Sequence, residues 1–111
     1  METPEFLSVT RKLLDDEERA ALVDYLAYNP SAGTVIPGTG GIRKLRWGLE
    51  GRGKRGGARV IYFFHNLEMP LFLLTAYAKN ERDDLSHADY VSFQQLTQML
   101  VHSYRIRRLK P

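Results

Sequence analysis

The apolar residues near the start of the chain recur at helical spacing. Thr3 is a favoured N-cap residue, Pro4 suits the first helical position, and Glu5 places a negative charge in the first turn. The apolar positions that follow lie three or four residues apart, at Phe6, Val9 and Leu13. This pattern predicts a first helix over residues 4–14.

A second helical pattern begins at Asp15. Asp15 and Glu18 have the spacing of a capping box, in which each side chain bonds the backbone N–H of the other residue. The apolar positions that follow are expected on one side of the helix, at Leu22, Val23, Tyr25 and Leu26. The helix is expected to end at Asn29-Pro30, because proline pushes the preceding residue out of the helical region.

Three strands and a final helix are predicted in the rest of the chain. Segments rich in β-branched and aromatic residues indicate strands over 42–47, 59–65 and 71–79. Turn-forming residues separate these segments, over 31–41, 48–57 and 66–70. Ser86 and Asp89 resemble another capping box and open a helix. Its expected buried face consists of Tyr90, Phe93, Leu96, Leu100 and Tyr104.

This order of elements predicts an α+β fold with a single domain over residues 1–111. Strands joined by short turns form a small antiparallel sheet, packed against an N-terminal helical hairpin and a C-terminal helix. We expect the helices to cover one face of the sheet and the functional site to lie on its open face.

The composition indicates a small cytoplasmic protein. The chain has 111 residues, of which 43% are hydrophobic, and this length supports one core. It contains no cysteine, which excludes disulfides and Cys-ligated zinc or iron–sulfur centres. The longest apolar runs fall far short of the roughly 20 residues that span a bilayer, and the first residues lack a signal-peptide pattern. We therefore expect no membrane association.

The net charge of +3 is unevenly distributed along the chain. Residues 1–33 hold seven acidic and three basic side chains, whereas residues 43–59 hold seven basic side chains and one acidic side chain. Such a concentrated positive field favours a polyanionic partner such as nucleic acid. The alternative is a basic surface that simply faces water.

Four cations are candidates for one shared site. Lys44 and Arg46 lie two residues apart in a predicted strand and therefore project from the same face. Arg59 begins the next strand and Lys79 ends the third, so all four converge if these strands are neighbours. Converging cations suit phosphodiester chemistry, because negative charge builds on the phosphate oxygens in the transition state.

Other candidate chemistry is weaker. Two glycine-rich patterns within residues 48–56 resemble phosphate-binding loops, but a predicted strand follows them instead of the helix that such loops require. The three histidines are dispersed, and no metal-ligand spacing occurs near the basic strip. We therefore expect neither a metal site nor a cofactor.

The aromatic residues of the strands have two possible roles, in the core or in contact with RNA. Phe63 and Phe72 are expected in the core, because alternation buries about half of the strand positions. Tyr62 and Tyr77 are candidates for stacking on RNA bases.

Four stretches of the sequence together resemble the HigB/RelE family of bacterial type II toxin–antitoxin toxins: Asn29-Pro30 and residues 35–47, 51–63 and 78–85. The resemblance implies a microbial-ribonuclease-like fold and metal-independent cleavage of mRNA in the ribosomal A site, which inhibits translation. The reaction implied is attack by the ribose 2′-OH on its own phosphodiester, which leaves a 2′,3′-cyclic phosphate and a 5′-OH. The resemblance further implies a cognate helix-turn-helix antitoxin of the HigA type, through which the toxin reaches operator DNA.

The resemblance also implies positions for the candidate catalytic residues. Lys44 and Arg46 match a pair of strand cations in the family, and Arg59 matches an arginine that begins the following strand. Lys79 matches a basic position after the third strand and is the candidate base, because neighbouring cations favour the neutral form of a lysine. The candidate RNA-binding residues are Arg43, Arg52, Lys54, Arg55 and Arg82.

The sequence departs from the family pattern at several points. Ser86 falls near the tyrosine that such toxins use in catalysis, and Asn80 stands where many of them have arginine. A first strand that commonly precedes Thr-Pro has no counterpart before Thr3, so either the sheet lacks an edge strand or the sequence begins late. An exposed edge could pair with an antitoxin or another chain.

Two other functions fit the same residues. One is a gyrase-poisoning toxin of the related ParE type, which acts by binding protein and does not need converging phosphate ligands. The other is a noncatalytic RNA-binding module with a basic face, for which salt-sensitive binding without cleavage is expected.

Overall fold

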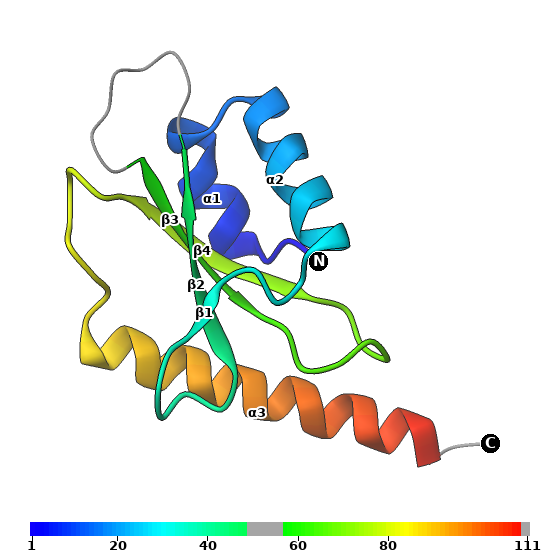
Figure 1. Ribbon diagram of the computed structural model, residues 1–111. Coiled ribbons are helices and arrows are strands. Elements are labelled where there is room, and N and C mark those ends of the chain that lie inside the picture. The colour runs from blue at the N-terminus through cyan, green and yellow to red at the C-terminus, as the bar shows by residue number, and fades with distance from the viewer. Residues whose placement is uncertain (49–56, 110–111) are drawn as a thin grey trace.

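The computed structural model describes residues 1–48 and 57–109, with side chains through Arg107. Its elements are, in chain order, α1 (Pro4–Leu13), α2 (Asp16–Tyr28), β1 (Thr34–Val35), β2 (Ile42–Trp47), β3 (Ala58–Phe63), β4 (Phe72–Ala78) and α3 (His87–Leu109). The strands form one antiparallel sheet in the order β1-β2-β3-β4 (Figure 1). The predicted α+β fold is confirmed, and β1 is an addition within the expected turn over 31–41.

The start of each helix follows from local side-chain chemistry. The N–H of Phe6 donates to the Thr3 hydroxyl at 3.2 Å, which caps α1. At α2, Asp15 and Glu18 form the predicted capping box, with bonds of 2.7 and 2.9 Å between each side chain and the other backbone N–H. Ser86 and Asp89 exchange equivalent bonds of 3.1 and 3.2 Å at the start of α3.

One face of the sheet, the α1/α2 face, is covered by the two N-terminal helices. Phe6 of α1 and Leu22 of α2 are fully buried there, against the strand side chains Leu45, Val60 and Leu73. Burial of apolar area of this kind is the main favourable term in folding, at about 25 cal/mol per Å². The α1/α2 face is therefore a dry apolar layer.

The opposite face, the α3 face, is covered in part by the C-terminal helix (Figure 1). Ile61 and Phe63 of β3 pack there with residues of α3 that include Phe93 and Leu100. The expectation that the helices cover one face only is therefore wrong. The physical reason is that β3 carries apolar side chains at successive positions, so both faces of the strand require cover and all its residues are buried.

Two helices bury fewer of their apolar residues than the sequence pattern predicts. In α2 only Leu22 and Leu26 are buried, whereas Val23 and Tyr25 are exposed. In α3, Leu96 is exposed and the neighbouring Thr97 is buried instead. Within the part of the chain described, no helix combines the length and apolar character needed to cross a membrane.

Residues 1–3 take the place of a first strand. Glu2 forms a parallel bridge with Leu73, the N–H of Leu73 donates to the carbonyl of Met1 at 2.8 Å, and the N–H of Thr3 donates to the carbonyl of Leu73 at 3.2 Å. The amino group of Met1 also donates to the carbonyl of Leu71. The start of β4 is thus paired on its outer edge, although by a single bridge and not by a further strand of the sheet.

Tyr62 ties the start of the sheet to the end of α2. Its side chain is fully buried, and its hydroxyl donates to the carbonyl of Pro30 at 2.8 Å while it accepts from the N–H of Gly33 at 2.8 Å. A Cβ atom at Gly33 would lie 2.8 Å from the Tyr62 ring, so only glycine fits there. Tyr62 therefore has a structural task, and the expectation that it stacks on RNA is wrong.

Candidate active site

The strand register brings three of the four predicted cations to the α3 face. Arg46 on β2 lies directly opposite Arg59 on β3, and Arg59 lies opposite Tyr77 on β4. Side chains directly opposite each other in a sheet share a face, and Lys44 shares it because it lies two residues before Arg46. We call this group the cation row: it consists of Lys44, Arg46, Arg59 and the neighbouring Tyr77.

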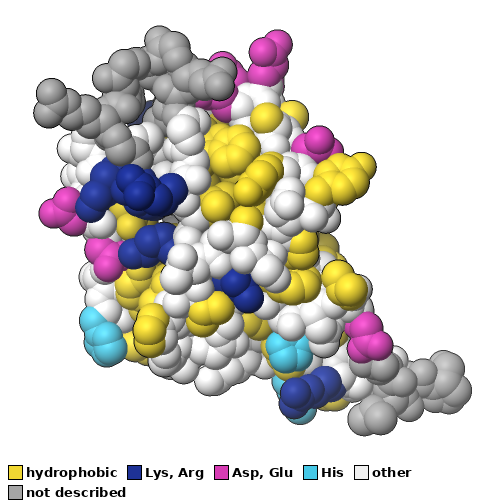
Figure 2. Space-filling model, in the orientation of Figure 1, with side chains coloured by type: hydrophobic (Ala, Val, Ile, Leu, Met, Phe, Trp, Pro, Cys, Tyr) yellow, Lys and Arg dark blue, Asp and Glu magenta, His cyan; other side chains and the backbone are white. Residues whose placement is uncertain are grey.

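The cation row continues the apolar layer under α3, and within the row Arg59 and Tyr77 are buried whereas Lys44 and Arg46 reach solvent. Along β2 the α3 face changes from Ile42 to Lys44 and then to Arg46, which is exposed. Arg59 is 9% exposed, and its guanidinium donates to the carbonyl of Ala58 at 3.4 Å. Figure 2 shows basic side chains gathered on one part of the molecular surface, with acidic side chains beside them.

Gly57 allows the strands to approach closely at this end of the sheet. It has a φ of +56°, and a Cβ atom there would collide with the carbonyl oxygen of Trp47. Its own carbonyl accepts the N–H of Lys79 at 3.0 Å, which extends the pairing of β3 and β4 past the strand ends. The turn chemistry around Gly57 therefore helps to hold Arg59 next to its neighbours in the cation row.

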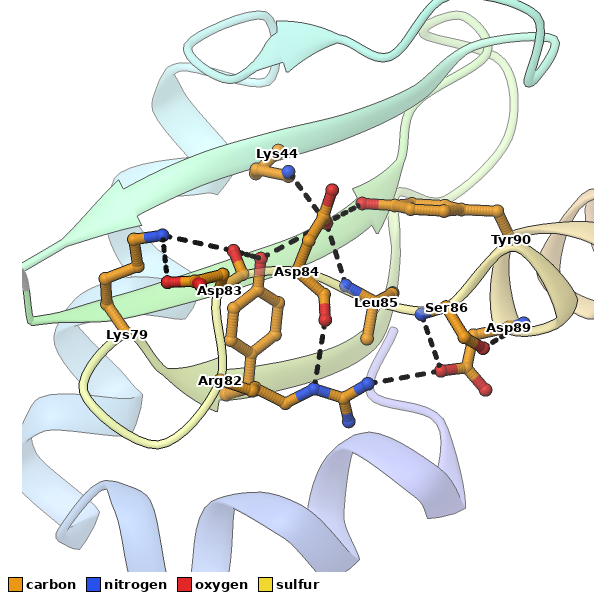
Figure 3. A network of polar contacts seen from close by, with 10 residues as sticks. Lys44, Lys79, Arg82, Asp83, Asp84, Leu85, Ser86, Asp89 and Tyr90 are labelled. Carbon is orange, nitrogen blue, oxygen red and sulfur yellow. Dashed lines mark hydrogen bonds and ion pairs between the residues drawn. The ribbon is translucent and has the colours of Figure 1, made fainter.

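Residues 79–86, called the acidic segment because they contain Asp83 and Asp84, carry carboxylates toward these cations (Figure 3). The Asp84 Oδ1 atom accepts from Lys44 Nζ at 3.0 Å, from the Tyr90 hydroxyl at 2.6 Å, from the N–H of Leu85 at 2.8 Å and, more weakly, from the Tyr77 hydroxyl at 3.5 Å. One carboxylate oxygen thus joins β2, β4, α3 and the acidic segment.

The charges of this network are set by its hydrogen bonds. Burial alone would raise the pKa of Asp84, but the hydrogen bonds from Tyr90, Lys44 and the Leu85 N–H outweigh it and lower the pKa to about 2. Burial and the Asp84 carboxylate both raise the pKa of Tyr90, and the same two causes raise that of Tyr77. At neutral pH, Asp84 is therefore an anionic acceptor and both phenols are neutral donors.

Lys79 lies at the end of the same region but is paired with a carboxylate. Its Nζ atom donates to Asp83 Oδ1 at 3.1 Å and to the Asp83 carbonyl at 3.2 Å. Lys79 was expected to act as a base because other cations would lie next to it. Its charged partner is instead the Asp83 carboxylate, which carries the opposite charge. The ion pairs Lys79–Asp83 and Lys44–Asp84 are open to water, with the aspartate side chains 96% and 52% exposed.

Of the five predicted RNA-binding residues, the structure describes two. Arg43 points away from the cation row, and its guanidinium donates to the carbonyls of Ser31 and Gly33 at 3.2 and 2.7 Å. Arg82 supports the acidic segment, because it donates to the Asp84 carbonyl at 3.1 Å and to Asp89 Oδ2 at 3.4 Å, with its guanidinium 5.6 Å from the centre of the Tyr77 ring. The other three, Arg52, Lys54 and Arg55, lie outside the described residues, as do the glycine-rich patterns.

Asp84 and Tyr90 were not among the predicted site residues, and Tyr77 was predicted only to stack on bases. Tyr90 was placed on the apolar face of α3, yet it lies in the first helical turn and its hydroxyl reaches back to Asp84. Ser86, near the expected position of the family tyrosine, is the N-cap residue of α3. The sequence did contain one signal for these residues, because Asp83 and Asp84 stand between a strand that ends near Lys79 and the capping residue Ser86. Their local pattern is that of a loop.

Two of the three histidines lie near each other. His65 and His102 line one hollow of about 330 Å³ between the end of β3 and α3, a proximity that the sequence did not indicate. Within residues 1–48 and 57–109, no group of three or more histidine and acidic side chains is arranged to bind a metal ion.

A comparison with protein families matches this part of the molecule. The model of the family described as the RelE toxin of the RelE/RelB toxin–antitoxin system matches residues 34–109. These residues run from β1 through α3, so they contain the whole cation row and the acidic segment, whereas α1 and α2 lie before the match.

Proposed function

The chain belongs to the RelE toxin family, and from this membership we propose that it is an endoribonuclease that cleaves mRNA in the ribosomal A site. Membership itself makes the protein the toxin of a toxin–antitoxin pair, with an antitoxin as its partner. The proposal adds the reaction, the substrate and the residues that act on it.

The observation that carries the proposal is the cation row. Arg46 and Arg59 are cross-strand partners, and Lys44 projects from the same face two residues away. Guanidinium and ammonium groups held side by side on a rigid sheet would bind a phosphodiester without reorganising during the reaction. Arg46 is exposed and Lys44 is half-buried, so an extended strand of RNA would reach these two cations from the solvent side.

The proposed reaction is an internal transfer that needs no metal ion. The ribose 2′-oxygen forms a bond to the adjacent phosphorus as its proton leaves, and the bond from phosphorus to the 5′-oxygen breaks as that oxygen gains a proton. The products are a 2′,3′-cyclic phosphate and a 5′-OH. Lys44, Arg46 and Arg59 stabilise the negative charge that grows on the phosphate oxygens, and Lys79 adds positive charge at the edge of the site.

The remaining contacts of the complex are proposed in less detail. Arg52, Lys54 and Arg55 follow β2 in the chain and would contact the backbone of mRNA or ribosomal RNA. The antitoxin is proposed to carry a helix-turn-helix domain and to connect the toxin to operator DNA. Arg43 and Arg82 are left out of the RNA contacts, because their guanidinium groups support the protein itself.

The test is cleavage of a defined mRNA on purified ribosomes, with the ends of the products identified. We expect 5′-OH ends and 2′,3′-cyclic phosphates from the wild-type protein, and strongly reduced cleavage for Lys44→Ala and Arg59→Lys. Arg11→Ala is the matched control, because it removes a cation from the exposed surface of α1. Equal cleavage by Lys44→Ala, Arg59→Lys and wild type would exclude the proposed site.

Induction in growing cells and RNA binding, measured beside this assay, separate the two alternative functions. A gyrase-poisoning toxin of the ParE type would leave mRNA intact in growing cells and induce the response to DNA damage. A noncatalytic RNA-binding module would bind RNA with strong dependence on salt, yet produce no cyclic phosphate even with ribosomes present. Either result would replace the endoribonuclease assignment.

A further inference from the structure

The Asp84 carboxylate lies where four hydrogen-bond donors converge. Lys44 Nζ, the Tyr90 hydroxyl and the Leu85 N–H lie 2.6–3.0 Å from Asp84 Oδ1 (Figure 3). The Tyr77 hydroxyl lies 3.5 Å from the same atom and 3.4 Å from the Asp83 carbonyl, so it shares one proton between the two acceptors. None of these donors needs a carboxylate in particular. A charged ammonium, two phenols and a backbone N–H are equally suited to a phosphate oxygen of RNA.

The position of Asp84 relative to the cation row strengthens this comparison. Lys44 belongs to both groups, and Tyr77 is the cross-strand neighbour of Arg59. A phosphate bound next to Arg59 and Arg46 would therefore approach the donors that hold Asp84. The Asp84 side chain is 52% exposed, so it can move out into water without opening the apolar core.

We propose that the donors around Asp84 form a phosphate-binding site for RNA, and that Asp84 occupies this site in the free toxin and is displaced when RNA binds. This inference rests on the proposed function and deepens it. It adds Tyr90 and Tyr77 as residues that contact the RNA backbone, and it makes Asp84 an internal competitor of the substrate. Part of the RNA-binding free energy is then spent on breaking the Lys44–Asp84 pair.

The competition predicts tighter RNA binding when Asp84 loses its charge. The probe is a short dye-labelled RNA oligonucleotide in which the 2′-oxygen of each ribose is methylated, so that cleavage cannot occur. Its dissociation constant is measured by fluorescence anisotropy at 0.15 M salt. We expect Asp84→Asn to lower the dissociation constant about fivefold, the upper range for an exposed ion pair. The Asn oxygen can still accept from the Leu85 N–H, which preserves the local turn.

Glu81→Gln is the matched control for the general effect of charge. Glu81 is an exposed residue of the same segment, and its removal takes one negative charge away without changing the donors around Asp84. At 0.15 M salt the Debye length is about 8 Å, so we expect less than a twofold effect from this control. Equal effects of the two substitutions, or weaker binding by a folded Asp84→Asn, would overturn the proposal.

A second arm tests whether the phenol joins the same site. In the Asp84→Asn background, Tyr90→Phe is expected to weaken binding of the probe again, because the freed hydroxyl is then a ligand of the phosphate. An unchanged dissociation constant would remove Tyr90 from the site. Cleavage on ribosomes is measured in parallel. If cleavage no longer depends on Lys44 and Arg59, the proposed function is overturned. If cleavage depends on them but Asp84→Asn does not bind the probe more tightly, only this inference is overturned.

Discussion

The two faces of the sheet are built from the same strands and have opposite properties. On the α1/α2 face most strand side chains, such as Leu45 and Val60, are apolar and pack with Phe6 and Leu22, and the cation Arg43 lies at its β1 edge, where it bonds to backbone carbonyls. On the α3 face the apolar layer stops part way, and β2 passes from Ile42 to Lys44 and then to an exposed Arg46.

This difference separates stability from chemistry within a single sheet. The α1/α2 face gives the strands a rigid apolar support, and that support fixes the cations that project from the other side. Substitutions on the α1/α2 face should therefore change the free energy of unfolding, whereas substitutions in the cation row should change RNA cleavage. The predictions below test this separation.

The largest effect is expected for Phe6→Ala on the α1/α2 face. The ring is fully buried against the sheet, and truncation of a buried Phe costs about 3–5 kcal/mol of stability through lost burial and the cavity left behind. Urea unfolding followed by circular dichroism measures this. Val23→Ala, at a half-exposed position of α2, is the control and should cost far less. A loss of under about 1 kcal/mol for Phe6→Ala would contradict the description of this face as tightly packed.

Arg46→Ala should show the opposite behaviour. Loss of one preorganised group that stabilises transition-state charge costs about 2.7–4 kcal/mol, or roughly 10²- to 10³-fold in rate. Because Arg46 is exposed, its removal should change the free energy of unfolding by no more than about 0.5 kcal/mol. Single-turnover cleavage and urea unfolding of the same preparation give both numbers. If stability falls as much as activity, the two faces are not separable at this residue.

Tyr62→Phe is expected to have an intermediate effect on stability alone. It removes the donor to Pro30 and leaves the N–H of Gly33 without its acceptor, which costs about 1–3 kcal/mol for a buried group. Tyr104→Phe is the matched control, since that ring is half-buried against Phe72 and no hydrogen bond of its hydroxyl to a described residue is present. Thermal unfolding compares the two variants, and equal midpoints would contradict a structural role for the Tyr62 hydroxyl.

The smallest effect concerns pH and the Asp84 network. Because the pKa of Asp84 is lowered to about 2 in the folded protein, its contribution to stability is present above its ordinary value of 3.8 and is lost as pH falls toward 2. We expect the difference in unfolding free energy between wild type and Asp84→Asn to shrink between pH 6 and pH 2.5. Exposure of the side chain to water keeps this difference small. A constant difference over that range would mean that the carboxylate contributes nothing as a charge.

Much of the fold was predictable because its signals are local. The capping boxes at Asp15 and Ser86 and the strand over 42–47 each follow from a few neighbouring residues, and each is confirmed. The placement of α3 was not predictable in the same way, since the continuous apolar run of β3 shows that the strand has two apolar faces but not which helix covers each one. β1 has only two residues and gives no periodic signal.

The candidate site was predictable only in part. The shared face of Lys44 and Arg46 follows from strand periodicity, and the same rule places Arg43 on the other side, although the analysis counted it among the RNA contacts. The meeting of Lys44 with Asp84 spans 40 residues of sequence and depends on how residues 79–86 cross the sheet. No local pattern encodes such a contact, so the acidic residue beside the cations was not foreseen.

The pairing of residues 1–3 with β4 has a consequence for the order in which the chain folds. Thr3 and Leu73 lie 70 positions apart, so the ribosome must release most of the protein before the first residues find their partner. Until then α1 has no completed sheet on which to dock. We expect the N-terminal helices to be among the last elements fixed during synthesis, with the newly made β4 edge briefly open to strands of other chains.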